Sequence, residues 1–403
     1  MSEELRSLRG LSKEEALRIA YLEGREDLFP TKLLLIESEG PKRGPESKKI
    51  CVLSRDPGSG NALTPVVNLL RQEKEMELLA LADGRAEEIF CKNFSVTADE
   101  SGREGLDALK AAGAPNLFLT GPSEEPGIEV SAVATYPEVP MVLLDVYYGD
   151  SLRLFKKFKE RDLPLPARVC VMDEEAERII LEHYPEFKER ISITGIPSMD
   201  RFASEDTEGI NLHTRERLGI APEEKLVVWM ATIDMTKELL RASVEELSQS
   251  KTPFTVIFRR HPRDNTPYDD YRAIIAEVGL RYVDTQALSS DEVGAAADLV
   301  LTTTSTEGLH AMYRRKPSIH VNDERHKKLY PGIFLPLPQV RSGASMGTED
   351  VQELSGLVNE LLDPLSARNQ ELLRNMETHY PRDGKNAARV VEVIKGVLKE
   401  RSG

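Results

Sequence analysis

The chain has 403 residues, 40% of them hydrophobic and 30% charged, which is typical of a soluble globular protein with two domains and excludes a disordered chain. A net charge of −15 argues against nucleic acid as the main partner, because a phosphate backbone attracts basic surfaces. Three scattered cysteines, and the lack of any apolar run of about 18 residues, favour a cytoplasmic protein without disulfides or a transmembrane segment.

Residues 1–47 are predicted to form an N-terminal appendage and linker. Their pattern indicates a helix, a short strand within "TKLLLIESEG", and a polar linker that runs up to "PKRGPESKK". The pattern assigns no function to this region.

From residue 48 the chain alternates short apolar runs with helical stretches. The strand-like runs of the first half are "ICVLS", "MELLALA", "NLFLTG", "PMVLLDV", "ARVCVM" and "RISITG". Apolar runs without a polar alternation are typical of parallel strands that helices cover on both faces. Residues 48–205 are therefore predicted to form a Rossmann-like domain.

An acidic, polar stretch over residues 203–225 marks the predicted boundary, after which the alternation restarts. The strand-like runs of the second half are "LVVWMAT", "FTVIFRR", "LRYVD", "DLVLTTT" and "SIHVN". Residues 206–375 are predicted to form a second Rossmann-like domain, and 376–403 a C-terminal helix that could pack back on the first. The predicted fold is α/β, with two parallel sheets facing a cleft and ligands at the carboxyl ends of the strands.

The stretch "ADLVLTTTSTEGLHAMYRRKPSIHV" carries the clearest functional pattern. A buried strand leads through four hydroxyl residues, 302–305, and then Thr306 into a helix. Thr304 and Glu307 have the spacing of a capping box, which offers a purely structural explanation. However, the hydroxyl residues exceed what a cap requires, and free N–H groups at the start of a helix attract anions. An anion-binding turn is the functional interpretation.

"VIFRRHPRDN" brings a histidine and arginines to the end of another strand of the same half. His261 follows that strand directly, flanked by Arg259, Arg260 and Arg263. An imidazole with neighbouring cations can bind a phosphate. The alternative is a strand-end histidine bonded to the backbone, with solvated arginines around it.

Together these two motifs resemble a known superfamily. "RRHPRD" followed by "AAADLVLTTTSTEGLHAMYRRKPSI" is similar to the C-terminal half of GT-B nucleotide-sugar glycosyltransferases and of their UDP-N-acetylglucosamine 2-epimerase relatives. The HP and ST motifs look most similar to those of enzymes with cytidine-activated donors, such as sialyltransferases and CDP-glycerol glycerophosphotransferases. "NLFLTGPSEEP" and "PMVLLDVYYGD" in the first half resemble the same superfamily.

The resemblance implies a set of binding residues. The phosphates of the donor would be bound by His261, Thr304, Ser305 and Thr306, with help from Arg259, Arg260 or Arg263. The loop "DPGSGN", with Gly58, Ser59 and Gly60, would face donor and acceptor across the cleft, unless it is an ordinary strand–helix turn. His310 stands where many GT-B enzymes carry a ribose-binding glutamate. It shares a helix face with Thr306, which would let it face the nucleotide. The alternative is a packed or surface histidine.

Transfer to a hydroxyl group also needs a general base from the first half. Asp145, Asp56 and Glu124 are the candidates at strand ends, and Asp145 is favoured because it follows a buried strand directly. Tyr147 and Tyr148, beside Asp145, could stack on a sugar ring. The structural alternative is a helix-capping aspartate with two tyrosines in a wall.

The sequence thus predicts a cytoplasmic glycosyltransferase that moves a sugar or polyol-phosphate group from a nucleotide-activated donor to an acceptor hydroxyl. No cofactor and no metal are expected, since His320 and His326 are six residues apart and lack ligand spacing. The acceptor is unknown, and a homodimer is left open. Two alternatives remain: a nucleotide-sugar 2-epimerase, and a GT-B scaffold that has lost catalysis and serves in binding or assembly.

Overall fold

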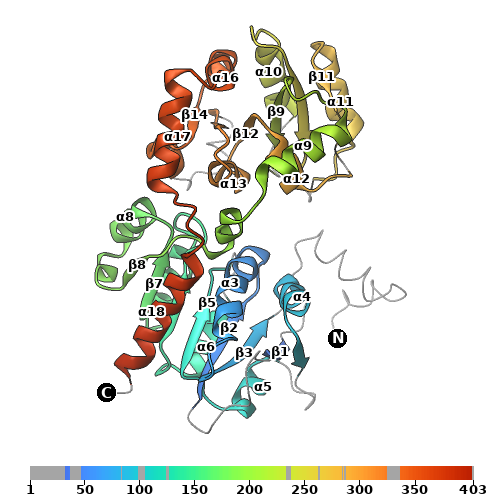
Figure 1. Ribbon diagram of the computed structural model, residues 1–403. Coiled ribbons are helices and arrows are strands. Elements are labelled where there is room, and N and C mark those ends of the chain that lie inside the picture. Colours follow the sequence, from blue (N-terminus) through green and yellow to red (C-terminus); the bar gives the residue numbers. More distant parts are fainter. Residues whose placement is uncertain are drawn as a thin grey trace, which may run out of the picture. The chain divides into compact units, whose positions relative to one another are not determined.

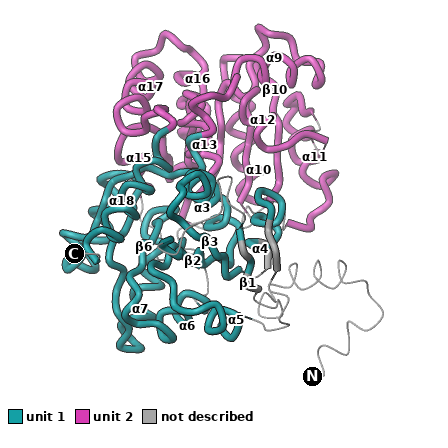
Figure 2. The backbone as a smooth tube through the Cα atoms, turned by 60° about the horizontal axis from the view of Figure 1, so that its bottom comes forward, with its two compact units in different colours: residues 1–200, 385–403 teal, residues 201–384 magenta. Residues whose placement is uncertain are grey.

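The computed structural model describes residues 32–36, 47–82, 84–98, 105–123, 127–232, 237–261, 264–283, 285, 287–324 and 336–401. The chain forms two compact units (Figure 2): unit 1 comprises Met1–Asp200 and Lys385–Gly403, and unit 2 comprises Arg201–Gly384. The first boundary lies at residue 200 where the sequence predicted 205. The second lies at residue 384, beyond the predicted 375, so the C-terminal segment of unit 1 is shorter than expected.

Unit 1 is built on an eight-stranded sheet with the order β4-β1-β3-β2-β5-β6-β7-β8 (Figure 1). Strands β2, β3, β5, β6, β7 and β8 pair in parallel. The strands are β1 (Lys32–Ile36), β2 (Lys48–Ser54), β3 (Met76–Ala82), β4 (Val96–Ala98), β5 (Leu117–Thr120), β6 (Met141–Leu144), β7 (Arg168–Val171) and β8 (Ile191–Ile193).

The predicted appendage contributes a strand to this sheet, which corrects its assignment as a separate region. Strand β1 runs antiparallel to β3, with Leu34 opposite Ala80, and antiparallel to β4. Leu34 and Ile36 lie in the core of unit 1. The sheet is therefore mixed rather than wholly parallel, because β1 enters beside β3 from the opposite direction.

The helices of unit 1 cover the sheet. Helices α3, α4 and α18 pack on one face, where their apolar residues join those of β2 and β3 in one core. The helices are α3 (Pro57–Leu70), α4 (Gly84–Asn93), α5 (Gly105–Ala112), α6 (Ile128–Thr135), α7 (Leu152–Glu160), α8 (Glu174–His183) and α18 (Asn386–Glu400), with 3-10 helices η2 (Pro185–Phe187) and η3 (Pro197–Ala203), the last running into unit 2. The C-terminal helix thus belongs to the fold of unit 1.

Unit 2 has a six-stranded parallel sheet with the order β11-β10-β9-β12-β13-β14. Its strands are β9 (Lys225–Met230), β10 (Phe254–Arg259), β11 (Arg281–Tyr282), β12 (Leu299–Thr302), β13 (Ser318–Val321) and β14 (Met346–Thr348). Its helices are α9 (Thr207–Leu218), α10 (Lys237–Leu247), α11 (Tyr268–Glu277), α12 (Ser290–Ala296), α13 (Glu307–Tyr313), α15 (Pro338–Arg341), η4 (Val351–Glu353), α16 (Leu354–Leu362) and α17 (Ala367–His379). Among the described residues, none of these helices or those of unit 1 combines the length and apolar character that a membrane crossing needs.

Candidate active site

The carboxyl edge of the unit 2 sheet gathers the residues that the sequence singled out. From β9 the chain continues to β10 on one side of the sheet, whereas from β12 it continues to β13 on the other side, so the loops after β9 and β12 diverge. Ligands of open α/β sheets bind at such a switch point. The Thr232 hydroxyl after β9 lies 2.7 Å from the Thr303 hydroxyl after β12. This contact holds the two diverging loops together at their base.

His261 lies at the same edge, two strands away from the hydroxyl residues. It follows β10, which pairs with β9, which in turn pairs with β12. Two strand spacings amount to about 10 Å. The histidine is half-buried, and its carbonyl oxygen accepts a hydrogen bond of 2.9 Å from the Asp264 amide. The edge therefore carries an imidazole on one side of β9 and hydroxyl groups on the other.

The arginines beside His261 are used largely to brace loops. Arg259 donates to the Thr285 carbonyl oxygen at 2.9 Å. Arg260 donates to the carbonyl oxygens of Asp264 and Thr266 at 2.7 and 2.6 Å, and its guanidinium lies 4.5 Å from the Tyr268 ring centroid. Both arginines thus have a structural role, and their help in phosphate binding stays a prediction. Arg263 lies outside the described residues.

The hydroxyl residues after β12, here called the hydroxyl-rich turn (residues 303–306), differ in exposure. The preceding Thr302 is buried and donates to the Met230 carbonyl oxygen at 2.8 Å. Thr303 is also buried, whereas Thr304 and Ser305 are half-buried and Thr306 is exposed. The last three hydroxyls are the ones that a ligand can reach.

Helix α13 starts differently from the sequence prediction. Thr306 is its N-cap, in a helical conformation and without a side-chain cap bond, and the Glu307 amide lies 3.3 Å from the Ser305 hydroxyl. The predicted capping box of Thr304 with Glu307 is therefore wrong. Because the chain is already helical at Thr306, the Glu307 side chain turns to His310 instead, at 3.2 Å.

A buried histidine supports the hydroxyl-rich turn from beneath. The Nδ1 of His320, in β13, donates to the Thr303 carbonyl oxygen at 2.6 Å, and Nε2 lies 3.3 Å from the Gln339 amide nitrogen. Burial lowers the pKa of His320 to about 4, against the opposing effect of the bond to Thr303. A Cβ atom on Gly308 would lie 2.6 Å from the His320 ring. The glycine therefore allows α13 to pack directly against this side chain. His326 lies outside the described residues.

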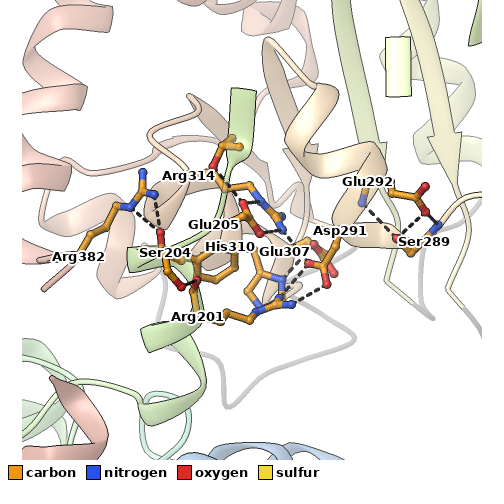
Figure 3. A network of polar contacts seen from close by, with 12 residues as sticks. Arg201, Ser204, Glu205, Ser289, Asp291, Glu292, Glu307, His310, Arg314 and Arg382 are labelled. Atoms are coloured by element: carbon orange, nitrogen blue, oxygen red, sulfur yellow. Dashed lines mark hydrogen bonds and ion pairs between the residues drawn. The ribbon is translucent and has the colours of Figure 1, made fainter. Parts of the chain in front are cut away.

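A polar network fixes α13 within unit 2 (Figure 3). The Arg314 side chain is 1% exposed and donates to Glu205 at 2.7 and 2.8 Å and to Asp291 at 2.8 Å. Arg201 contacts the same Asp291 at 2.6 and 2.8 Å. The network joins the entry into unit 2, helix α12 and helix α13.

His310 belongs to the same surroundings. Besides its contact with Glu307, its ring centroid lies 5.5 Å from that of the buried Phe202. The side chain of His310 is 19% exposed. This geometry supports the packed alternative for His310.

Unit 1 carries a cavity of about 240 Å³ at the carboxyl ends of β2, β5 and β6. Chain order reverses between β2 and β5, so this is also a switch point. The lining residues are Asp56, Gly58, Ser59, Pro122, Ser123, Val146, Asp150 and Arg153. This set is here called the unit 1 cavity.

Two of the three candidate bases, Asp56 and Asp145, have different environments; Glu124 lies outside the described residues. Asp56 lines the unit 1 cavity and gives α3 no side-chain cap bond. Asp145 is 3% exposed, and its carboxylate accepts from the amides of Gly149 at 3.2 Å and Ser151 at 2.9 Å. Burial and the charge of Asp150 raise the pKa of Asp145 to about 7, although the bonds from Ser151 and Gly149 lower it. Asp145 is thus placed to hold the loop of residues 149–151.

The neighbouring tyrosine has a similar structural role. The hydroxyl of Tyr148 donates to Asp173 at 2.8 Å, and its side chain is buried. Tyr148 therefore cannot offer a ring face to a sugar, as the sequence had suggested. Asp173 itself caps α8 through the Ala176 amide.

Gly58, Ser59 and Gly60 form the first turn of α3 rather than a loop, which corrects the sequence prediction. The helix starts early because Pro57 suits its first position. A Cβ atom on Gly60 would lie 3.2 Å from Ile89 and 3.6 Å from the Ala86 backbone, so this glycine allows α3 and α4 to pack closely. Gly58 is exposed and lines the unit 1 cavity.

Comparison with solved structures defines the fold. The chain resembles S. aureus MnaA in complex with UDP (14% identity, 87% of this chain and 97% of that chain, TM-score 0.59). It also resembles the Neisseria meningitidis UDP-GlcNAc 2-epimerase bound to UDP-GlcNAc (14%, 86% and 100%, 0.58). A third relative is a variant of the wall teichoic acid polymerase TagF with CDPG (11%, 89% and 90%, 0.52). These likenesses and the two sheets define a GT-B fold.

The family follows from the sequence itself. The model of the family described as CDP-glycerol:poly(glycerophosphate) glycerophosphotransferase matches residues 156–396, more than half of the chain. The chain belongs to this family, and it is a transferase of nucleotide-activated polyol-phosphate groups. No curated protein matches the sequence.

Proposed function

We propose that the donor is CDP-glycerol and that unit 2 binds its diphosphate at the carboxyl edge of the sheet. The observation that carries this proposal is that His261 and the hydroxyl-rich turn lie at one edge, on the two sides of β9. The description of the family, which names this donor, supports the same choice. The accessible groups for the phosphates are His261, Thr304, Ser305 and Thr306.

The proposed reaction breaks the anhydride bond of the donor. The acceptor oxygen attacks the phosphorus that carries the glycerol, and CMP leaves with the electron pair of the broken P–O bond. Phosphoryl transfer of this kind depends on positioning and on stabilising the charge of the leaving phosphate. Hydroxyl groups and an imidazole at a strand edge provide such hydrogen bonds, and we propose that they do so without a metal.

The unit 1 cavity is the proposed site of the acceptor hydroxyl. It contains the carboxylates of Asp56 and Asp150, the guanidinium of Arg153 and the hydroxyls of Ser59 and Ser123. Two carboxylates with one guanidinium suit a hydroxyl-bearing end better than a phosphate, because the net charge is negative. We propose that the acceptor is the terminal glycerol of a poly(glycerophosphate) chain, the acceptor that the family description names.

Calorimetric titration of CDP-glycerol tests the donor site. Removing one hydrogen bond to a charged group costs about 1.5–3 kcal/mol, so His261→Ala should weaken binding about 10- to 100-fold. His213→Ala, an exposed histidine in α9 of the same unit, is the matched control and should bind as tightly as wild type. Equal affinity of wild type and His261→Ala, or tighter binding of UDP-GlcNAc than of CDP-glycerol, would refute the proposed donor site.

A further inference from the structure

Glu129 is a buried carboxyl group that the sequence analysis did not consider. It lies in the first turn of α6 and is 0% exposed. Its Oε1 accepts a hydrogen bond from the Ser123 hydroxyl, and its Oε2 accepts one of 3.3 Å from the Gly127 amide. Among the described residues, no cationic side chain forms an ion pair with it. Both of these hydrogen-bond donors are uncharged.

Ser123 connects this acid to the unit 1 cavity. The serine lines the cavity, although its surface is only 3% exposed. Its hydroxyl donates to Glu129, so its oxygen retains lone pairs with which it can accept a hydrogen bond from another hydroxyl. A hydroxyl-bearing molecule in the cavity would therefore reach Glu129 through one serine.

Burial, together with the nearby charge of Asp56, favours a proton on Glu129 near neutral pH. Burial raises the pKa of Glu129 to about 7, against the bonds from Ser123 and Gly127 that lower it, and the charge of Asp56 raises it further. Asp56 approaches from the turn between β2 and α3, while Asp150 and Arg153 line the same cavity from the loop after β6 and from α7. A general base works best when its pKa lies close to the working pH.

We propose that Ser123 and Glu129 form a proton relay that deprotonates the acceptor hydroxyl in the unit 1 cavity; this rests on the proposed function. The acceptor O–H gives its proton to the Ser123 oxygen while the Ser123 proton passes to Glu129. The freed acceptor oxygen forms the new bond to phosphorus, and CMP leaves. Glu129 then loses its proton to solvent before the next cycle. Ser123 touches the acceptor, whereas Glu129 acts through it.

A purely structural explanation makes a different prediction. If the pair only ties the loop of residues 121–123 to α6, an uncharged hydrogen-bonding side chain should replace Glu129 without changing how the rate depends on pH. Glu129→Gln keeps the shape and one acceptor oxygen, but it cannot take up a proton. The pH profile therefore separates the two roles.

The experiment follows CMP release from CDP-glycerol, with a glycerol phosphate trimer as acceptor, between pH 5 and 9. In wild type, kcat/KM for the acceptor should fall about tenfold per pH unit below pH 7, because the relay then holds a proton. Glu129→Gln and Ser123→Ala should lower kcat about 10²- to 10⁴-fold and lose this acid limb. Calorimetric affinity for CDP-glycerol should stay within about twofold of wild type in both variants, since neither residue belongs to the proposed donor site.

Glu138→Gln, the same chemical change at an exposed position after α6, is the matched control and should retain the wild-type profile. If Glu129→Gln does not fold, Ser123→Ala, which removes a single hydroxyl group, carries the test. Variants that keep the acid limb, or rates within threefold of wild type, would overturn the relay while leaving the proposed function intact. A wild-type protein that binds CDP-glycerol but releases no CMP would refute the proposed function and the relay with it.

Discussion

The imidazole of His320 lies fully buried under the hydroxyl-rich turn, with its Nδ1 bonded to the Thr303 carbonyl oxygen. Burial favours the neutral ring, and its two hydrogen-bond partners among the described residues, Thr303 and Gln339, carry no charge. The neutral ring fixes the direction of the Thr303 peptide and therefore the start of the turn. At the residue scale, the proposed donor site depends on a histidine that does not itself touch the donor.

Acid should destabilise unit 2 through His320. Its pKa is about 4 in the folded protein and about 6.5 when unfolded, so its stabilising effect is complete above pH 6.5 and is lost as the pH falls toward 4. The free energy of unfolding should drop by about 2 kcal/mol from pH 7 to pH 5. Urea titration followed by the fluorescence of Trp229, the sole tryptophan and a buried residue of β9, measures this in unit 2. His320→Gln should show a smaller drop; an unchanged drop would contradict the assignment.

Side-chain roles at the two sites were partly predictable. His261 and the hydroxyl-rich turn could be found because polar residues directly after apolar strands collect at one sheet edge. Glu129 was missed, since a glutamate in a first helical turn usually indicates a solvated end. The sign that could have revealed it is the apolar surroundings in "GIEVSAVA". For His320, the apolar run "SIHV" pointed to burial, but its partner Thr303 depends on the tertiary fold.

At the element scale, helix α13 is held by the Arg314 network rather than by its own cap. Arg314, at the C-terminal end of this helix, reaches Glu205 and Asp291, and its guanidinium lies 4.7 Å from the Phe202 ring centroid. Burial alone would raise the pKa of Asp291, but bonds from Arg201 and Arg314 outweigh it and lower the pKa to about 2. The network thus fixes a short helix whose start carries the proposed phosphate ligands.

Arg314→Ala should destabilise unit 2 by about 3–5 kcal/mol, because it leaves Glu205 and Asp291 without their buried partner. Arg201→Ala removes a guanidinium whose side chain is 45% exposed from the same Asp291, and it should cost about 1 kcal/mol or less. The two variants are compared by urea titration with Trp229 fluorescence. If both variants lost a similar free energy of unfolding, the burial of Arg314 would not determine how much this network stabilises unit 2.

The order of strands and helices was largely predictable, because each long strand is a run of apolar residues. The strands β4 and β14 were not predicted, since "VTA" and "MGT" are short and carry small or polar residues. Strand β1 was predicted as a strand, but not as part of the sheet. Its antiparallel pairing with β3 depends on a contact between segments that are distant in sequence, for which local patterns carry no signal.

At the scale of the whole molecule, each unit presents its site at a switch point of its own sheet. In unit 1 the point lies between β2 and β5, and in unit 2 between β9 and β12. The unit 1 site offers carboxylates and hydroxyls, whereas the unit 2 site offers an imidazole and hydroxyls. This difference fits an acceptor hydroxyl in one unit and a phosphate-bearing donor in the other. In the proposed function, the groups of unit 2 bind an anion locally although the chain has a net charge of −15.

The measurement that tests the central claim most directly is ³¹P NMR of CDP-glycerol mixed with a glycerol phosphate trimer and the protein, in the presence of EDTA. We expect the diphosphate signals to decay, CMP to appear, and a new phosphodiester signal to grow in equal amount. His261→Ala should slow all three changes at least about tenfold, as expected from losing one charge-assisted bond. An unchanged donor would contradict the account, as would CMP formed with free glycerol phosphate and no diester.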